Sequence, residues 1–180
     1  MSGCYVGFSQ GIHTGGRFCY YLSQALKAAP SDVEGIVIGG HGDTTMIPLL
    51  SKATCKSMPV TKLLTKPAGQ KVVAATMVGG ATLTKLLGTS AWYAPGASCA
   101  AMVKSILLDE KKVFPCCCYL EGEYGEEDLC IGVPAVIGKR GCEKILKYEL
   151  TKEEQATFAK SAAAVKNVNN VLYESKILSR

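Results

Sequence analysis

The stretch from Lys112 to Leu150 constrains the fold most, because short β-prone runs alternate there with glycine turns. Three runs are expected as strands, at 113–120, 129–137 and 142–148. Strands that follow one another through short turns pair antiparallel, so this stretch predicts an antiparallel meander. Such a sheet buries one face, and the helical segments elsewhere in the chain are expected to cover it.

Helical spacing of apolar residues marks four further segments. Residues 17–30 read as one helix, which Pro30 closes. A long broken helix is expected over 71–87 and again over 88–112. Its two central glycines, Gly79 and Gly80, each cost about 1 kcal/mol relative to alanine, so they indicate close packing or a bend. Pro95 then marks a first turn or a kink.

The C-terminal segment reads as an amphipathic helix over 151–172. It starts with a capping box, Thr151 and Glu154. Its apolar face is expected to cover the sheet; that face consists of Phe158, Ala162, Val165, Val168 and Leu172.

Extended segments fill the region between the first two helices. Residues 34–40 read as a short buried strand, and 43–49 as the return of a hairpin or a second extended piece. Residues 51–70 read as a loop with at most one short helical turn. This order of helices and strands favours an α+β fold in one unit, which 180 residues can build around a sizeable core.

Composition narrows the class of protein. No apolar run is long enough to span a bilayer and no secretory signal is evident, so a cytoplasmic protein without membrane contact is expected. The nine cysteines are an odd number, and Cys116, Cys117 and Cys118 are consecutive, so we interpret them as reduced packing residues. No C-x-x-C pair exists and no metal site is expected. The net charge of +5 includes a lysine-rich stretch without interleaved aromatics, which indicates a solvated face and not a nucleic-acid site.

One of the two histidines, His41, lies where a strand is expected to end. Gly39 and Gly40 precede it, and Gly42 and Asp43 follow. A lone histidine is most often structural. Loops at strand ends, however, commonly carry functional groups, and an imidazole exchanges protons near neutral pH. His41 is therefore a candidate catalytic residue.

Several long motifs resemble the lactate/malate dehydrogenase family, in its branch of lactate-dehydrogenase-like malate dehydrogenases. They are "GGHGDTTMIPL", "MVGGATLTKLLGTSAWYAPGA", "FPCCCYLEGEYGEEDLCIGVPAVIG" and "CEKIL", in the family's order. The resemblance runs from Arg17 to about Leu172 and covers only the family's second half, the substrate domain. It implies an α+β C-terminal catalytic domain over 17–180, without the nucleotide-binding Rossmann domain, and an aberrant N-terminal segment over 1–16.

The resemblance also implies roles for three residues. His41 would be the acid/base that exchanges a proton with malate or oxaloacetate. Arg17 would hold a carboxylate of this small dicarboxylate substrate, because a guanidinium makes two parallel bonds to a carboxylate. Ser90 would line the substrate pocket. The alternatives are an exposed charge at a helix N-terminus for Arg17 and a helix N-cap for Ser90.

Two departures from the family pattern stand out. The family has an aspartate three residues before the arginine, paired with the histidine, whereas this chain has Thr14 there, or His13 if the register shifts by one. No G-x-G-x-x-G turn and no P-loop occur, so NAD is implied only by the resemblance and its binding residues are unknown.

Three hypotheses follow. The first is the catalytic half of an NAD-dependent malate dehydrogenase, an oxidoreductase inactive without a separate nucleotide-binding half. The second is a non-catalytic remnant or association module, because an uncovered apolar face invites a partner or a homo-oligomer. The third is a fragment of a lactate or other 2-hydroxy-acid dehydrogenase.

Overall fold

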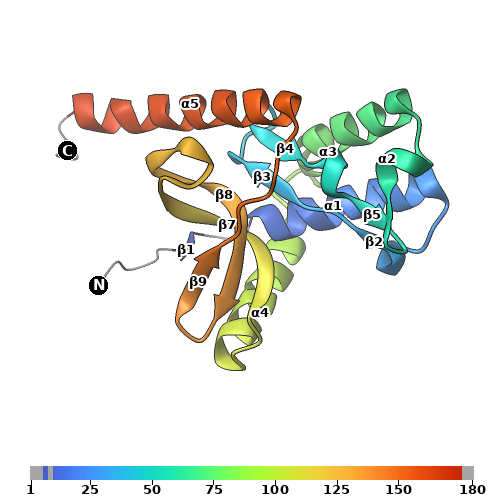
Figure 1. The fold of residues 1–180 in the computed structure, drawn as a ribbon, viewed down its shortest axis with the longest axis horizontal. Helices are drawn as coiled ribbons and strands as arrows, with labels where there is room; N and C mark the ends of the chain where they lie inside the picture. The colour runs from blue at the N-terminus through green and yellow to red at the C-terminus, as the bar shows by residue number, and fades with distance from the viewer. Residues whose placement is uncertain (1–5, 8–9, 176–180) are drawn as a thin grey trace.

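A long antiparallel hairpin forms the middle of the fold (Figure 1). The computed structural model describes residues 6–7 and 10–175. The hairpin pairs β7 (Lys112–Glu121) with β8 (Glu127–Gly138), and β9 (Gly141–Ile145) adds to the other side of β8. The expected meander is confirmed, although the third strand ends at Ile145 and not at Tyr148.

Three short strands complete this sheet, whose order is β1-β7-β8-β3-β4 with β9 beside β8. They are β1 (Val6–Gly7), β3 (Val37–Gly39) and β4 (Met46–Pro48). The expected hairpin return is confirmed, because β4 pairs antiparallel with β3. All its pairings among the described residues are antiparallel.

The single strand predicted over 34–40 is wrong. The chain instead forms β2 (Val33–Glu34), leaves it at Gly35 and re-enters the main sheet as β3. A Cβ at Gly35 would lie 2.7 Å from Cδ1 of Phe18, so the chain passes directly against a helix there. β2 belongs to a small second sheet with β5 (Thr54–Cys55) and β6 (Met58–Pro59).

The first helix, α1 (Gln10–Leu26), begins seven residues before the predicted start at Arg17. Its glycine-rich beginning disfavours a helix by propensity, but Thr14 is buried there at 4% exposure. Packing therefore decides the helix start. Farther along, Phe18 and Leu22 are fully buried in a core shared with the second sheet and the next long helix.

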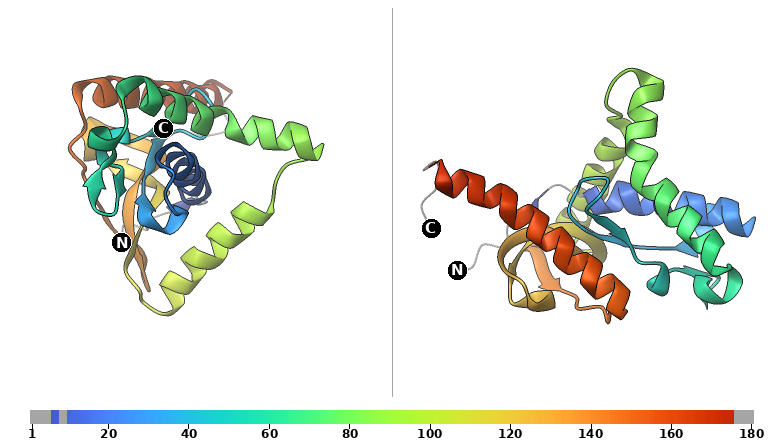
Figure 2. Two further views of the ribbon diagram at one scale, coloured as in Figure 1. Left: turned by 90° about the vertical axis from the view of Figure 1, so that its right-hand side faces the viewer. Right: turned by 90° about the horizontal axis from the view of Figure 1, so that it is seen from above.

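Two long helices follow the short turn α2 (Val60–Leu63). α3 (Lys66–Leu87) starts five residues before the predicted 71, because Pro67 occupies the first turn, where a missing N–H costs nothing. It continues through both central glycines. α4 (Tyr93–Leu107) also has its proline, Pro95, in the first turn and not at a kink. In Figure 2, α3 and α4 diverge from one corner with α1 between them.

The last helix, α5 (Lys152–Glu174), begins with the predicted capping box on Thr151. Its first half covers the sheet, where Phe158 and Ala162 are buried. The second half extends beyond the sheet (Figure 1), and Val168 there is 67% exposed. The prediction that this helix covers the sheet as far as Leu172 is therefore wrong for its last turns.

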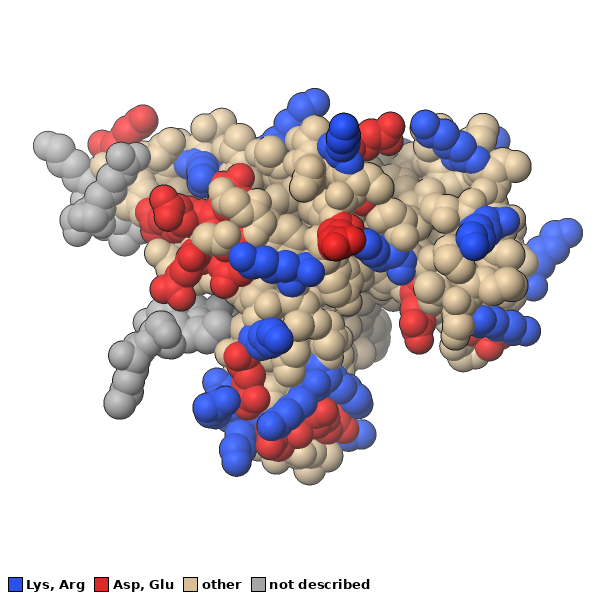
Figure 3. All heavy atoms as spheres, in the orientation of Figure 1, with Lys and Arg blue, Asp and Glu red and all other residues tan. Residues whose placement is uncertain are grey.

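The consecutive cysteines alternate across the sheet. Cys116 and Cys118 are fully buried in the core, which confirms their packing role, while Cys117 points to the opposite face. None of the eight cysteines among the described residues forms a disulfide. No described helix is long and apolar enough to cross a membrane. On the face shown in Figure 3, the Lys and Arg side chains are interspersed with Asp and Glu or lie singly, and they form no continuous basic patch.

Candidate functional site

The loop over 40–45 carries His41 and is held tightly by its own backbone. Gly39, just before it, has a φ of +93°, and a Cβ there would lie 2.5 Å from the carbonyl oxygen of Thr45. Only glycine adopts this conformation without strain. Within the loop, the Gly42 N–H donates to Oγ1 of Thr45 at 2.8 Å. The glycines before the histidine thus permit the sharp turn that presents it.

Helix α5 fastens both ends of this loop through one side chain, Ser161. The Gly40 N–H donates to Oγ of Ser161 at 2.8 Å, and Ser161 Oγ donates to the carbonyl of Thr45 at 2.7 Å. Ser161 is 3% exposed. Sequence reasoning missed this residue, and the available signal was a serine beside Ala162 on the buried face of an amphipathic helix.

The structure brings the three predicted site residues together. His41, Arg17 and Ser90 line one pocket of about 460 Å³. Its walls come from α1, the loop over 40–45 with the first residue of β4, the C-terminal half of α3 and the segment that starts α4. The other lining residues are His13, Thr14, Asp43, Met46, Gly80, Ala81, Leu83, Thr84, Ala91, Ala94 and Pro95.

Arg17 reaches the pocket across α3. Its Nη1 donates to the carbonyl of Thr76 at 3.2 Å. A Cβ at Gly79 would lie 2.6 Å from Cδ of Arg17, and one at Gly80 would lie 3.2 Å from its Nη1. The two glycines therefore make room for the arginine, which confirms their packing role. Arg17 is half-buried in the middle of α1, so the alternative of an exposed charge at a helix N-terminus is wrong.

Ser90 lies in the exposed segment between α3 and α4. The N-cap of α4 is Trp92, so the N-cap alternative for Ser90 is wrong. Its place at the pocket wall leaves the hydroxyl available to a ligand.

Three influences set the charge of His41. Burial of the imidazole against the pocket walls lowers its pKa below the ordinary 6.5, Asp43 raises it, and Arg17 lowers it again. The net direction is downward, so the imidazole is mainly neutral at pH 7. Thr14, three residues before Arg17, is buried at the pocket and supplies no charge.

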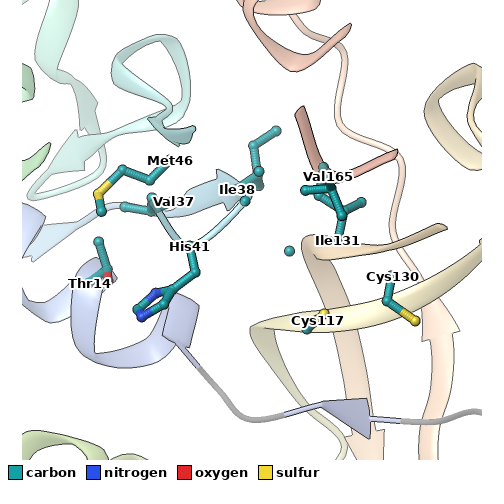
Figure 4. A pocket seen from close by; sticks show the side chains of 12 residues that line it. Thr14, Val37, Ile38, His41, Met46, Cys117, Cys130, Ile131 and Val165 are labelled. Carbon is teal, nitrogen blue, oxygen red and sulfur yellow. The ribbon is translucent and has the colours of Figure 1, made fainter. Parts of the chain in front are cut away.

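A second, smaller pocket of about 240 Å³ lies on the other side of His41 (Figure 4). Thr14, His41 and Met46 line both pockets. Two thiols, Cys117 and Cys130, form part of its far wall on the sheet. Burial raises the pKa of Cys117 to about 11, so this wall is uncharged at neutral pH.

The described residues do not fit a dinucleotide. Such a site is built at the carboxyl ends of parallel strands, beside a glycine-rich turn that opens a helix. Every strand pairing in the described part of the chain is antiparallel. The same part of the chain holds no group of three or more His, Cys, Asp or Glu that could bind a metal ion.

Comparison with known proteins identifies the family of this fold. The family described as "lactate/malate dehydrogenase, alpha/beta C-terminal domain" matches residues 16–174. The chain belongs to the lactate/malate dehydrogenase family. The expected fold, an α+β C-terminal domain of this family, is confirmed.

Relatives in sequence are bacterial malate dehydrogenases. The chain is 65% identical to that of Parabacteroides distasonis over 158 residues, which are 88% of this chain and 50% of that protein. It is 62% identical to that of Bacteroides thetaiotaomicron over the same shares. The chain thus spans about half the length of the curated relatives it matches.

Solved structures of the family have the same fold. The malate dehydrogenase of Cryptosporidium parvum superposes with a TM-score of 0.89 at 38% identity, over 94% of this chain and 55% of that one. The lactate dehydrogenase of the same organism, complexed with lactic acid and nicotinamide adenine dinucleotide, has a TM-score of 0.88 at 32% identity. That superposition covers 93% of this chain and 54% of the lactate dehydrogenase chain.

Proposed function

We propose that this chain is the substrate-binding and proton-transfer half of an NAD-dependent malate dehydrogenase. The observation that carries the proposal is the single pocket that His41, Arg17 and Ser90 share. This pocket lies in a chain whose relatives are malate dehydrogenases. In this proposal residues 17–180 form the working unit and residues 1–16 depart from the family pattern.

The chemistry follows from the side chains. The guanidinium of Arg17 would make two parallel bonds to a substrate carboxylate and fix the substrate's orientation. The neutral imidazole of His41 would then accept the proton of the 2-hydroxyl group; in the reverse direction the protonated imidazole would donate it to the keto oxygen. Leu83, Ala94 and Pro95 would contribute an apolar wall beside these groups.

NAD, the hydride carrier in this proposal, would be held by residues other than those described here. The exposed apolar side chains of α3 and α4 support a covering partner, either a nucleotide-binding half or a second copy of this chain. They include Leu86 at 78%, Tyr93 at 85% and Leu107 at 76% exposure. The absence of disulfides among the described cysteines favours the reducing cytoplasm.

The test measures NADH oxidation with oxaloacetate by the purified chain, alone and mixed with a nucleotide-binding half from a malate dehydrogenase. We expect negligible turnover alone and activity in the mixture. His41→Asn should lower that activity at least about 100-fold, as loss of an acid/base group does. Full activity of the His41→Asn mixture would overturn the catalytic role, and robust activity alone would overturn the need for a second half.

Assays of the same mixture with a nucleotide-binding half distinguish two alternative functions. A non-catalytic association module, favoured by the uncharged Thr14, would bind its partner without turnover. A lactate-type enzyme would reduce pyruvate faster than oxaloacetate, and the likeness to a lactate dehydrogenase at 32% identity makes that comparison necessary.

A further inference from the structure

His13 and His41 are the only two histidines in the chain, and the fold places them together. Their rings meet edge to face, with centroids 6.5 Å apart and planes at 79°. His13 comes from α1, one turn before Arg17, and is half-buried, whereas His41 comes from the loop over 40–45. Both rings line the 460 Å³ pocket.

The charged groups of that pocket are few. Among its described lining residues, α1 contributes His13 and Arg17, and the loop contributes His41 and Asp43. The lining residues from α3 and from the segment that starts α4 are all uncharged. Arg17 and Asp43 carry opposite charges, so the sign of the pocket is set by how many protons the two imidazoles hold. Histidines ordinarily change charge between pH 5 and 8.

We propose that His13 and His41 together make this pocket a proton-gated site for small dianions, chiefly dicarboxylates, which bind more tightly as the pH falls. This inference rests on the proposed function in taking the pocket as the substrate site. It adds His13 as a second group that contacts the ligand. Two imidazolium rings at this separation repel each other and Arg17, and a bound dianion removes that repulsion.

Linkage fixes the size of the effect. A ligand whose binding raises the pKa of an imidazole by about 1 unit gains about tenfold in affinity once the pH lies below both the free and the bound pKa. Two such groups predict an increase of about 100-fold between pH 7.5 and pH 5.5, and one predicts about tenfold. The monocarboxylate lactate should show a smaller increase, because one negative charge offsets less of the repulsion.

The probe is tartrate, which stays a dianion across this pH range. Calorimetry on the purified chain gives its affinity at each pH. Carbon-edited NMR follows the Cε1–H signals of the two imidazoles, which are the only ones in the chain. We expect both signals to titrate at higher pH when tartrate is bound.

Two variants of one residue separate charge from structure. His13→Gln keeps a polar side chain that cannot titrate, and should reduce the pH effect from about 100-fold to about tenfold. His13→Lys keeps a positive charge at all these pH values, and should bind tartrate at pH 7.5 more tightly than His13→Gln. Circular dichroism confirms that both variants fold.

An unchanged pH effect in His13→Gln, or no tartrate binding at any pH, would overturn the inference. Its failure is distinct from that of the proposed function, because the proposed function is tested by the loss of activity in the His41→Asn mixture, in which His13 is unchanged. Conversely, pH-dependent tartrate binding together with an inactive mixture would support this inference and contradict the proposed function.

Discussion

Replacing Thr14 by aspartate should place a negative charge beside His41. Thr14 is 4% exposed on α1 and lines both pockets that flank His41, and Figure 4 shows the two side chains facing each other. A carboxylate about 5 Å from an imidazolium is worth about 3 kcal/mol at an effective dielectric constant of about 20. Water screens part of this at the exposed His41, so we expect about 1.4 kcal/mol, or about 1 pH unit.

The substitution should raise the pKa of His41, because a negative neighbour favours the protonated imidazole. In the wild type the pKa of His41 lies below 6.5, so proton donation to a keto acid should decline as the pH rises through that lowered value. In Thr14→Asp this decline should move to higher pH. NMR titration of the His41 Cε1–H signal measures the shift, and the pH profile of oxaloacetate reduction in the mixture measures its consequence.

Thr14→Asn is the matched control, since it introduces a similar shape without charge. Arg17 lies three residues farther along α1 and limits the cost of the buried carboxylate. If the pKa of His41 in Thr14→Asp differed from that in Thr14→Asn by less than about 0.3 unit, or fell, the electrostatic reasoning would be refuted.

Three further predictions address other parts of the site. Ser161→Ala leaves two backbone groups without partners, so it should lower the free energy of unfolding in urea by about 1–3 kcal/mol and speed hydrogen exchange in the loop. Exchange at the wild-type rate would contradict this. Gly79→Ala should displace the guanidinium of Arg17 and weaken tartrate binding at pH 6. In the control Gly96→Ala the new Cβ has nothing within 4 Å, so tartrate binding should be unchanged and the folded chain should be more stable by up to about 1 kcal/mol. Burial raises the pKa of Cys116 to about 12, so iodoacetamide at pH 8 should modify the exposed Cys130 and spare Cys116, as mass spectrometry of peptides would reveal.

Local patterns predicted the elements whose signals are local. The meander follows from β-prone runs and glycine turns, and the start of α5 from a capping box that needs only Thr151 and Glu154. The starts of α1 and α3 were predicted too late. In α1, burial of Thr14 outweighs poor helix propensity, and in α3, Pro67 belongs to the first turn and not to a loop.

In the candidate site, too, the sequence predicted the residues that belong to local motifs and missed the contacts between distant segments. The family motifs carry His41, Arg17 and Ser90, and the structure adds that all three line one pocket. The contact between His13 and His41 and the support from Ser161 depend on how distant segments pack. No spacing within the sequence reports either contact, because each joins elements that only the tertiary fold brings together.

The bond between Gly40 and Ser161 spans 121 residues, and this has a consequence for biosynthesis. Ser161 is translated 121 residues after Gly40, so the histidine loop leaves the ribosome well before the helix that fastens it. Until that helix docks, the loop lacks two of its hydrogen bonds. The pocket therefore reaches its final form only after that helix has been translated, and a nascent chain truncated before residue 161 holds the histidine loop by its own hydrogen bonds alone.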